Sequence, residues 1–490
     1  MRPVRLAAAI LLGLVAAIGL HEADSACAAE ADRRPNVLWI ISDDHSRDDL
    51  GCYGNRCVKT PNVDRLARQA TRFTRAFAAA PTCAPTRSGL ITGMYPISIG
   101  AHNQRNAEAV LPPQVRLLPQ YLKEAGYFCV NANWNLQRPG KTDYQFQWDR
   151  QSTYERATDW AQRKPGQPFF AQVQIAEPHR TFKPDPESPI DPDQITLPPQ
   201  YPDDPVVRID FAQYLESVQI ADRKVGEILR KLEAEGDADN TVVFFFSDQG
   251  RPFPRGKQFL YDEGLAIPLI IRWPGKLEAG SVCDHLVSMI DFAPTCLSLA
   301  GLDVPGHMHG VVFLGDRATR RECLFASRDR VDDAVDRIRC LRTERYKYIR
   351  NFYPELPYDQ DETYMVMMHP TLAALKKWHA EGRLNEAQSK WMAPRRPEEE
   401  LYDLAADPHE LCNLADDAKH RQILVELRGR LDRWIAETND HGRTREPEEL
   451  LASIRREYQE RLAQTLKKRG LERPEELYDY WRRTLEPTRR

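Results

Sequence analysis

The sequence carries little net charge and, after its first thirty residues, no long hydrophobic run. Its 490 residues include 68 lysines and arginines against 72 aspartates and glutamates, a formal net charge of -4 at pH 7. A charge this small over a chain of this length gives no reason to expect a nucleic-acid partner or a membrane surface. No later segment is apolar enough to span a bilayer, so we expect no transmembrane segment in the mature chain. An anionic ligand would therefore need a local basic pocket.

The first thirty residues follow the pattern of an export signal. Arg2 and Arg5 precede the apolar residues 6–20, and the small residues 25–29 follow. Because the apolar run is shorter than the roughly 20 residues of a spanning helix, it does not predict a membrane anchor. Residues 1–28 are predicted to be a cleaved signal peptide, so the mature protein should be exported, either periplasmic or secreted.

Short apolar runs recur between stretches of helical character. They lie at residues 37–41, 127–130, 169–175, 242–246 and 267–271. Runs of this kind suit strands buried on both faces of a parallel sheet that helices cover. Helices are predicted to begin at Thr60 and Pro61, and to extend from Asp210 to Gly236. The alternation predicts a large doubly wound, mostly parallel α/β domain over residues 35–320.

The remainder of the chain has a different pattern. Residues 340–351 alternate and are rich in β-branched and aromatic side chains, which is typical of antiparallel strands. We therefore expect a smaller α+β subdomain at residues 321–440, followed by a charged helical tail at 441–490. The proline-rich residues 183–205 predict a long surface loop that is a candidate wall of the site.

Acidic and amide side chains directly follow two of the predicted strands. Asp43 and Asp44 end the first, and Asp248 and Gln249 end the fourth. The carboxyl ends of strands form the ligand crevice in open α/β sheets, so we expect these four residues to converge. Three carboxylates and an amide oxygen suit Ca²⁺ or Mg²⁺ and suit Zn²⁺ poorly. The alternative is that each pair only caps a turn.

A third motif lies between these clusters. Residues 83–87 read Cys-Ala-Pro-Thr-Arg, and Thr-Gly follows at 92–93. The pattern Cys-x-Pro-x-Arg with a following Thr-Gly resembles the signature of type I sulfatases, in the alkaline-phosphatase-like superfamily. The sequences at residues 35–37 and 401–404 also resemble those of that family. The resemblance covers most of the mature chain and implies the alkaline-phosphatase-like fold.

The resemblance implies a modified nucleophile. A formylglycine-generating enzyme would oxidise Cys83 to formylglycine, whose hydrate offers two hydroxyl groups. One would attack sulfur, and the other would then lose its proton so that sulfate is released. Cys83 should begin a helix whose free N–H groups favour anions, and Arg87, one turn on, should steady the hydrate. The implied ligands of a divalent cation, Ca²⁺ before Mg²⁺, are Asp43, Asp44, Cys83, Asp248 and Gln249.

Basic residues of the family pattern are also present. Lys257 follows the second acidic cluster and, with Lys141, would contact sulfate oxygens. His179 follows a predicted strand and would protonate the leaving oxygen or nitrogen. For each of these residues, the alternative is an ordinary structural or solvated role.

The chain departs from the family at one position. The usual Gly-Lys-x-His appears here as Gly-Lys-Thr-Asp at residues 140–143. Asp143, His102 or another group would therefore act as the base that releases sulfate. His102 and Arg105, just beyond the nucleophile helix, are candidate substrate contacts, with an ordinary loop role as the alternative.

Residues 247–254 are similar to the corresponding stretch of the sulfamidases, the heparan N-sulfatases. This similarity favours a heparan-type glycan bearing N-sulfoglucosamine as the substrate, with other O-sulfated polysaccharides second. Two alternatives stay open. One is a phosphodiesterase or phosphonate monoester hydrolase of the same superfamily, and the other is a non-catalytic carbohydrate-binding relative.

Cysteine use fits an oxidising compartment. Of ten cysteines, Cys27 lies in the leader and Cys83 is the predicted nucleophile, which leaves an even number. Cys52 and Cys57 flank a short loop and are the predicted disulfide. Pairing and buried free thiols stay equally open for Cys129, Cys283, Cys296, Cys323, Cys340 and Cys412.

Overall fold

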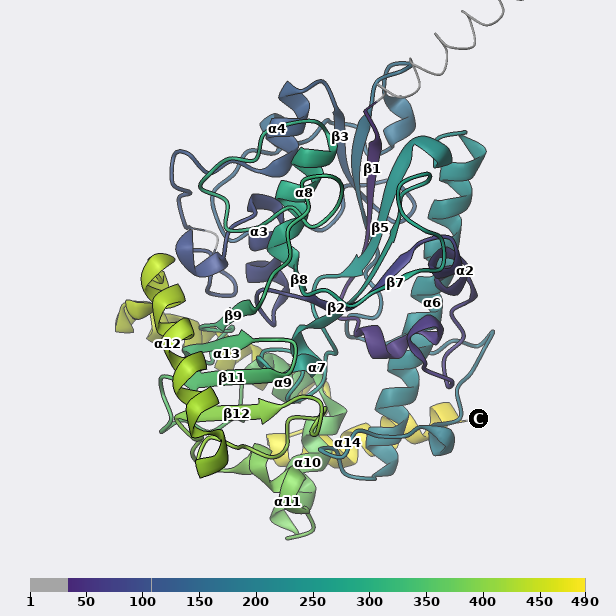
Figure 1. The fold of residues 1–490 in the computed structure, drawn as a ribbon. Coiled ribbons are helices and arrows are strands. Elements are labelled where there is room, and N and C mark those ends of the chain that lie inside the picture. The colour runs from purple at the N-terminus through teal and green to yellow at the C-terminus, as the bar shows by residue number, and fades with distance from the viewer. Residues whose placement is uncertain (1–33, 107, 490) are drawn as a thin grey trace, which may run out of the picture.

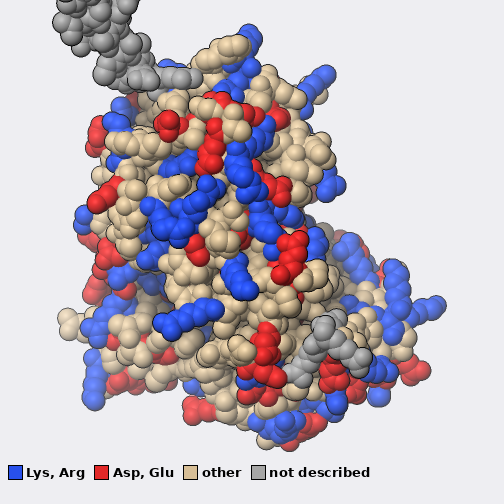
Figure 2. Space-filling view, turned by 90° about the vertical axis from the view of Figure 1, so that its right-hand side faces the viewer, with Lys and Arg blue, Asp and Glu red and all other residues tan. Residues whose placement is uncertain are grey.

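Two sheets organise the chain. The computed structural model describes residues 34–106 and 108–489, so the predicted signal peptide lies outside the described residues. Figure 1 shows a large sheet in the upper part of the molecule and a smaller sheet below it. Among the helices described, none has the length and apolar character needed to cross a membrane. Figure 2 shows both signs of charge interspersed over one face, in keeping with the small net charge.

The large sheet is mixed but mostly parallel, as predicted. Its strands are β1 (Asn36–Ser42), β2 (Thr71–Phe77), β3 (Phe128–Asn133), β4 (Phe169–Gln174), β5 (Thr241–Ser247), β6 (Ala266–Arg272), β7 (Val282–Cys283) and β8 (Val287–Ser288). They lie in the order β3-β4-β1-β5-β6-β2-β7, and β8 pairs with β2. Strands β3, β4, β1 and β5 are parallel neighbours, so their carboxyl ends meet at one edge.

The apolar run at residues 267–271 is a strand, as predicted, but its predicted direction was wrong. It forms β6, which is antiparallel to both β5 and β2 rather than parallel. A parallel pair needs a long crossover, but here the chain doubles back after β5. The amide of Gly250 donates to Gly264 O at 3.0 Å, and that of Arg251 donates to Glu263 O at 3.0 Å. The returning strand therefore enters the sheet in the opposite direction.

Helices cover both faces of the large sheet (Figure 1). One face carries α2 (Pro61–Arg68) and α6 (Pro205–Ala234), and the other carries α3 (Cys83–Thr92), α4 (Leu118–Glu124) and α8 (Phe292–Leu299). Thr60 is the N-cap of α2, as predicted. Helix α6 begins before the predicted Asp210, because Asp204 accepts from Val206 N at 2.8 Å and so caps it.

The smaller sheet is antiparallel and follows the large one in sequence. Its strands are β9 (Leu324–Arg328), β10 (Ile338–Arg342), β11 (Tyr346–Asn351) and β12 (Glu399–Asp403), in the order β12-β11-β10-β9. The antiparallel strands predicted at residues 340–351 are confirmed. Lys347, fully buried, lies 2.6 Å from Asp262 Oδ1 and 2.9 Å from Glu410 Oε1. Because Asp262 begins the short helix Asp262–Leu265 that leads into β6, this ion pair joins the two sheets.

The remaining helices are short or lie in the C-terminal part. They are α5 (Arg150–Thr153), α7 (Asp262–Leu265), α9 (Thr363–Met368), α10 (Pro370–Ala380), α11 (Glu386–Ser389), α12 (Arg421–Glu437), α13 (Glu448–Lys468) and α14 (Leu477–Leu485). The proline-rich segment holds only a 3-10 helix at Pro192–Gln194 before α6 begins. The tail is helical, as expected, and Tyr458 on α13 donates to Asp332 Oδ1 at 2.8 Å.

The predicted disulfide between Cys52 and Cys57 is absent. Every cysteine in the described part of the chain is a free thiol. The Cys52 amide donates to Asp64 Oδ1 at 2.8 Å, while the Cys57 thiol donates to Gln194 O at 3.7 Å. Cys52 and Cys57 therefore contact different parts of the chain and are not bonded to each other.

Candidate active site

The two acidic clusters converge as the sequence predicts. Strands β1 and β5 are paired in register up to Ser42 and Ser247, so the residues that follow meet at the same sheet edge. The Asp44 amide donates to Asp248 Oδ1 at 3.1 Å, and the Gln249 amide group donates to Asp44 Oδ1. All four clustered side chains are buried, including Asp43.

The backbone at this edge is tightly constrained. Asp44 has a φ of 62°, in the left-handed region that non-glycine residues rarely adopt. A Cβ at Gly250 would lie 2.1 Å from the Glu263 carbonyl oxygen. Glycine is therefore required where the chain leaves the second cluster and turns back toward β6.

Arg87 connects the clusters to the helix that carries Cys83. Its Nε donates to Asp248 Oδ2 at 2.8 Å and its Nη2 to Asp43 Oδ2 at 3.2 Å. Its Nη1 donates to Gln174 Oε1 at 2.8 Å. The guanidinium is buried, so its charge faces these carboxylates without intervening solvent. Sequence reasoning missed Gln174, although a polar residue inside an apolar strand was a usable signal.

Cys83 is the first residue of α3, as predicted. It is buried, and Gln104 Nε2 lies 3.5 Å from its sulfur while Gln104 Oε1 accepts from Ala84 N at 3.3 Å. Burial raises the pKa of the Cys83 thiol, although the positive charges of Lys141 and Lys257 act in the opposite direction. An unmodified thiol here stays protonated at neutral pH and is a weak nucleophile.

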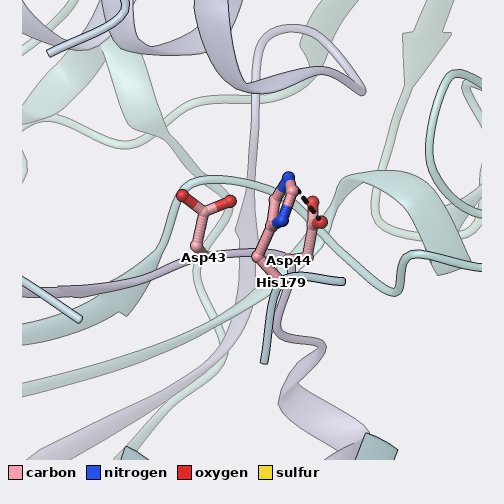
Figure 3. A group of neighbouring side chains, drawn as sticks. All are labelled: Asp43, Asp44 and His179. Atoms are coloured by element: carbon pink, nitrogen blue, oxygen red, sulfur yellow. Dashed lines mark ion pairs between the residues drawn. The ribbon is translucent and has the colours of Figure 1, made fainter. Parts of the chain in front are cut away.

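Three basic residues surround the first acidic pair. Lys141 Nζ lies 2.6 Å from Asp43 Oδ2, and Lys257 Nζ lies 2.8 Å from Asp44 Oδ2. His179 Nε2 lies 3.8 Å from Asp44 Oδ2, and Figure 3 shows the imidazole ring beside this carboxylate. This edge of the sheet therefore combines buried carboxylates with basic side chains of the kind that suit an anion.

The charges of this cluster shift one another's pKa values. Burial opposes ionisation of Asp43, but the charges of Lys141 and its other basic neighbours outweigh this and hold its pKa below the usual range. Burial and the charge of Asp43 raise the pKa of Asp248 to about 6. Burial, followed by the charge of Lys257, lowers the pKa of His179, while the charges of Asp44 and Asp43 act in the opposite direction.

Asp143, His102 and Arg105 were predicted as a base or as substrate contacts, and they lie in three different places. Asp143 Oδ2 lies 3.2 Å from Lys141 Nζ, so this carboxylate is at the crevice. His102 lines a separate pocket with Asp329, and burial lowers its pKa. Arg105 is exposed, and its Nε lies 3.9 Å from Asp332 Oδ1.

The acidic cluster fits a divalent cation. Asp43 Oδ1 and Gln249 Oε1 are buried and have no hydrogen-bond partner, which is costly for oxygen atoms unless a ligand satisfies them. Ligand atoms of Asp43, Asp44 and His179 all lie within 4.8 Å of one another. Histidine was not assigned to this group from the sequence. These residues therefore form a candidate metal site composed mainly of oxygen donors.

Comparison with known proteins agrees with this geometry. Residues 35–302 match the family model described as Sulfatase. The chain belongs to the sulfatase family. Residues 255–373 match a second model, the C-terminal domain of N-sulphoglucosamine sulphohydrolase. The predicted family is thus confirmed, and with it the activity class, a hydrolase of sulfuric esters or sulfamates.

Individual relatives support the same class. An ulvan-active sulfatase of Formosa agariphila is 36% identical over 474 residues, covering 85% of this chain and 77% of the relative. Human N-sulphoglucosamine sulphohydrolase is 28% identical over 476 residues, covering 83% and 91%. A solved structure of BT4656 with its substrate D-glucosamine-2-N,6-O-disulfate has a TM-score of 0.60 at 21% identity, covering 83% of this chain and 98% of that one. This last likeness establishes the shared fold.

Proposed function

We propose that this sulfatase removes sulfate from a sulfated glycan, with formylglycine derived from Cys83 as nucleophile and a divalent cation, Ca²⁺ before Mg²⁺. The observation that carries the proposal is the position of Cys83. It begins α3, and it lies where the charges of Lys141, Lys257 and Asp43 all act on its side chain. A sulfate ester is an anion that repels nucleophiles, so positive charge must offset its oxygens.

We assign a separate role in binding or proton transfer to each of the side chains near Cys83. We assign Lys141 and Lys257 to the sulfate oxygens, because both amines keep their charge beside carboxylates. His179 is assigned to protonate the leaving oxygen or nitrogen. Arg87 would steady the hydrate at position 83, and Asp143 is our candidate for the base that releases sulfate because it lies at the crevice.

A bound cation would add positive charge that favours ionisation of the nucleophile and offsets charge on the sulfate. Its proposed ligands are residue 83 with Asp43, Asp44, Asp248 and Gln249. The two unpaired buried oxygens, Asp43 Oδ1 and Gln249 Oε1, support this assignment. Ca²⁺ is placed before Mg²⁺ because the proposed ligands are several oxygens of the protein itself, whereas Mg²⁺ usually keeps several waters and binds only one or two carboxylates.

For the substrate, we propose a heparan-type glycan bearing N-sulfoglucosamine first. The match of residues 255–373 to the C-terminal domain of N-sulphoglucosamine sulphohydrolase supports this choice. The ulvan-active relative makes an ulvan-type polysaccharide the second candidate. Arg105, exposed near the nucleophile, is a candidate contact to the glycan, and His102 is a weaker one because it lines another pocket. Export of the mature enzyme, after removal of residues 1–28, would bring it to such polymers.

The test is expression with a formylglycine-generating enzyme, followed by mass analysis of the peptide that contains position 83. Sulfate release is then measured from N-sulfoglucosamine, O-sulfated disaccharides and ulvan fragments, with an aryl phosphodiester as competitor. Cys83→Ala should abolish turnover, whereas Cys129→Ala, a change at a buried cysteine of β3, should keep it.

Two results would contradict the proposal. Faster turnover of the phosphodiester than of every sulfate would identify a phosphodiesterase or phosphonate monoester hydrolase. An unmodified thiol at position 83 without turnover, from a host that converts a control sulfatase, would identify a non-catalytic carbohydrate-binding relative.

A further inference from the structure

Tyr364 lies beside the crevice but has no part in the chemistry described so far. It belongs to α9, outside the large sheet. Lys257 Nζ lies 5.5 Å from the centroid of its ring, and the centroid of the His179 ring lies 6.3 Å from it. Lys257 and His179 both approach Asp44 Oδ2. Tyr364 therefore adjoins the two basic residues that flank this carboxylate.

The hydroxyl group of Tyr364 is buried and has no hydrogen-bond partner. Leaving a buried hydroxyl unpaired costs free energy, so each such group in a native structure calls for an explanation. It is the only tyrosine hydroxyl with this property within residues 34–106 and 108–489. By contrast, Tyr214 donates to Asp49 Oδ2 at 2.7 Å and Tyr201 to Glu263 Oε1 at 2.8 Å.

The phenol is in the right protonation state to donate a hydrogen bond. Burial raises the pKa of Tyr364 to about 12, with the charge of Lys257 acting against burial and that of Asp44 adding to it. The group therefore keeps its proton at any pH where the enzyme would work. Cys83 is also close enough to influence the pKa of this hydroxyl, so Tyr364 and Cys83 belong to the same cluster of side chains.

The backbone before Tyr364 holds the residue in place. Glu362 is the N-cap of α9, and its carboxylate accepts from the amides of Tyr364 at 2.8 Å and Met365 at 2.9 Å. The ring of His369 packs edge-on against Tyr364 with centroids 5.5 Å apart. A donor fixed in advance, with no partner of its own, is what recognition of an anion requires.

We propose that Tyr364 is a substrate-binding residue whose hydroxyl donates a hydrogen bond to an oxygen of the sulfate group, on the side of Lys257 and His179. This inference rests on the proposed function and extends it, because it adds to the pocket a residue from outside the large sheet. The sulfate would then accept the hydrogen bond that this hydroxyl, alone among the tyrosines of residues 34–106 and 108–489, lacks within the protein.

The experiment compares Tyr364→Phe with the wild-type enzyme, and both proteins carry formylglycine at position 83. Loss of a hydrogen bond to a charged acceptor should lower kcat/KM roughly 10- to 150-fold. Inhibition by inorganic sulfate should weaken in the same direction. The thermal midpoint should stay unchanged or rise, because the hydroxyl makes no hydrogen bond within the protein and its burial is costly. Tyr478→Phe is the matched control, since the hydroxyl of Tyr478 on α14 donates to Oδ2 of Asp204, the N-cap of α6, at 2.9 Å. This variant should lower the midpoint and leave kcat/KM unchanged.

A second measurement needs no turnover. Binding of inorganic sulfate is compared by calorimetry between Cys83→Ala and the double variant Cys83→Ala with Tyr364→Phe, and the double variant should bind more weakly. Equal binding, or a Tyr364→Phe enzyme with wild-type kcat/KM, would overturn the role of Tyr364. A lower midpoint in Tyr364→Phe would overturn it as well, in favour of a structural role. A wild-type enzyme that is inactive on every sulfate would instead overturn the proposed function, while the binding comparison still decides the role of Tyr364.

Discussion

Arg87 Nε donates to Asp248 Oδ2 at 2.8 Å, a contact between residues 161 positions apart in the sequence. The same guanidinium donates to Asp43, so one buried cation separates two buried carboxylates that come from different strand ends. Helix α3, which presents Cys83, is thereby fixed to the acidic edge of the sheet. The position of Cys83 and the charge balance of the cluster depend on the same side chain.

Replacing Arg87 with methionine should destabilise the protein because Asp43 and Asp248 lose the cation between them. We expect the free energy of unfolding to fall by about 3–5 kcal/mol at pH 7, measured by denaturant titration without added metal. Arg87→Lys keeps the charge but not the planar set of donors, so its loss should be smaller. Equal stability of the three proteins would contradict this account.

Removing divalent cations should lower both activity and thermal stability. Because a cation binds only the folded site, adding Ca²⁺ at about 100 times its dissociation constant should restore about 2.7 kcal/mol. The shift should vanish in Asp43→Asn, which alters an unpaired buried oxygen. It should persist in Asp303→Asn, where the carboxylate is fully exposed. A Ca²⁺-dependent midpoint in Asp43→Asn equal to that of the wild type would exclude this site.

Asp143→Asn should slow the release of sulfate from position 83 more than it slows attack. The sulfated enzyme should then accumulate and be visible by mass analysis of the intact protein during turnover. His102→Gln is the matched comparison, because His102 lines a different pocket and should show no such accumulation. If His102→Gln accumulates the adduct and Asp143→Asn does not, the base is the histidine.

Asp440 should make the protein sensitive to acid. It accepts from Arg339 at 2.7 Å and Arg337 at 2.9 Å. Burial opposes its ionisation, but the charge of Arg339 and then Arg337 lowers the pKa of Asp440 to about 2. The unfolded value is about 3.9. Because the folded value is the lower one, the stabilisation of about 2–3 kcal/mol is full above about pH 4 and is lost as the pH falls toward 2.

The measurement is the free energy of unfolding of wild type and Asp440→Asn across this range. The variant should be less stable at pH 7 and show a flatter decline between about pH 4 and pH 2. Asp316→Asn, at an exposed position, should follow the wild-type curve. Parallel curves for Asp440→Asn and wild type would show that other groups control acid unfolding.

The acidic cluster was predictable because it depends on local patterns. Buried apolar runs marked β1 and β5, and the residues after each run are polar, so convergence of Asp43 and Asp248 followed from the rule for parallel strands. The start of α3 at Cys83 was predictable in the same way. These features need only the sequence near each strand or helix and one topological rule.

Other features depend on contacts that local sequence does not contain. Strand β2 includes arginines and lacks a continuous apolar run, so its pattern did not mark it as buried in the sheet. The antiparallel direction of β6 depends on a turn back that Gly250 permits. Gln104 and Tyr364 are ordinary loop and helix residues in sequence, and only tertiary packing brings them near Cys83 and Lys257.

The buried ion pair of Lys347 with Asp262 joins the small sheet to the segment that runs from Lys257 to β6. Asp262 lies between Lys257, which adjoins Asp44, and the start of β6. A substitution that breaks this ion pair, even one far from any substrate, should change the position of the Lys257 amine relative to Asp44. We therefore expect substitutions at the junction between the sheets to lower hydrolysis even when the proposed cation ligands stay intact.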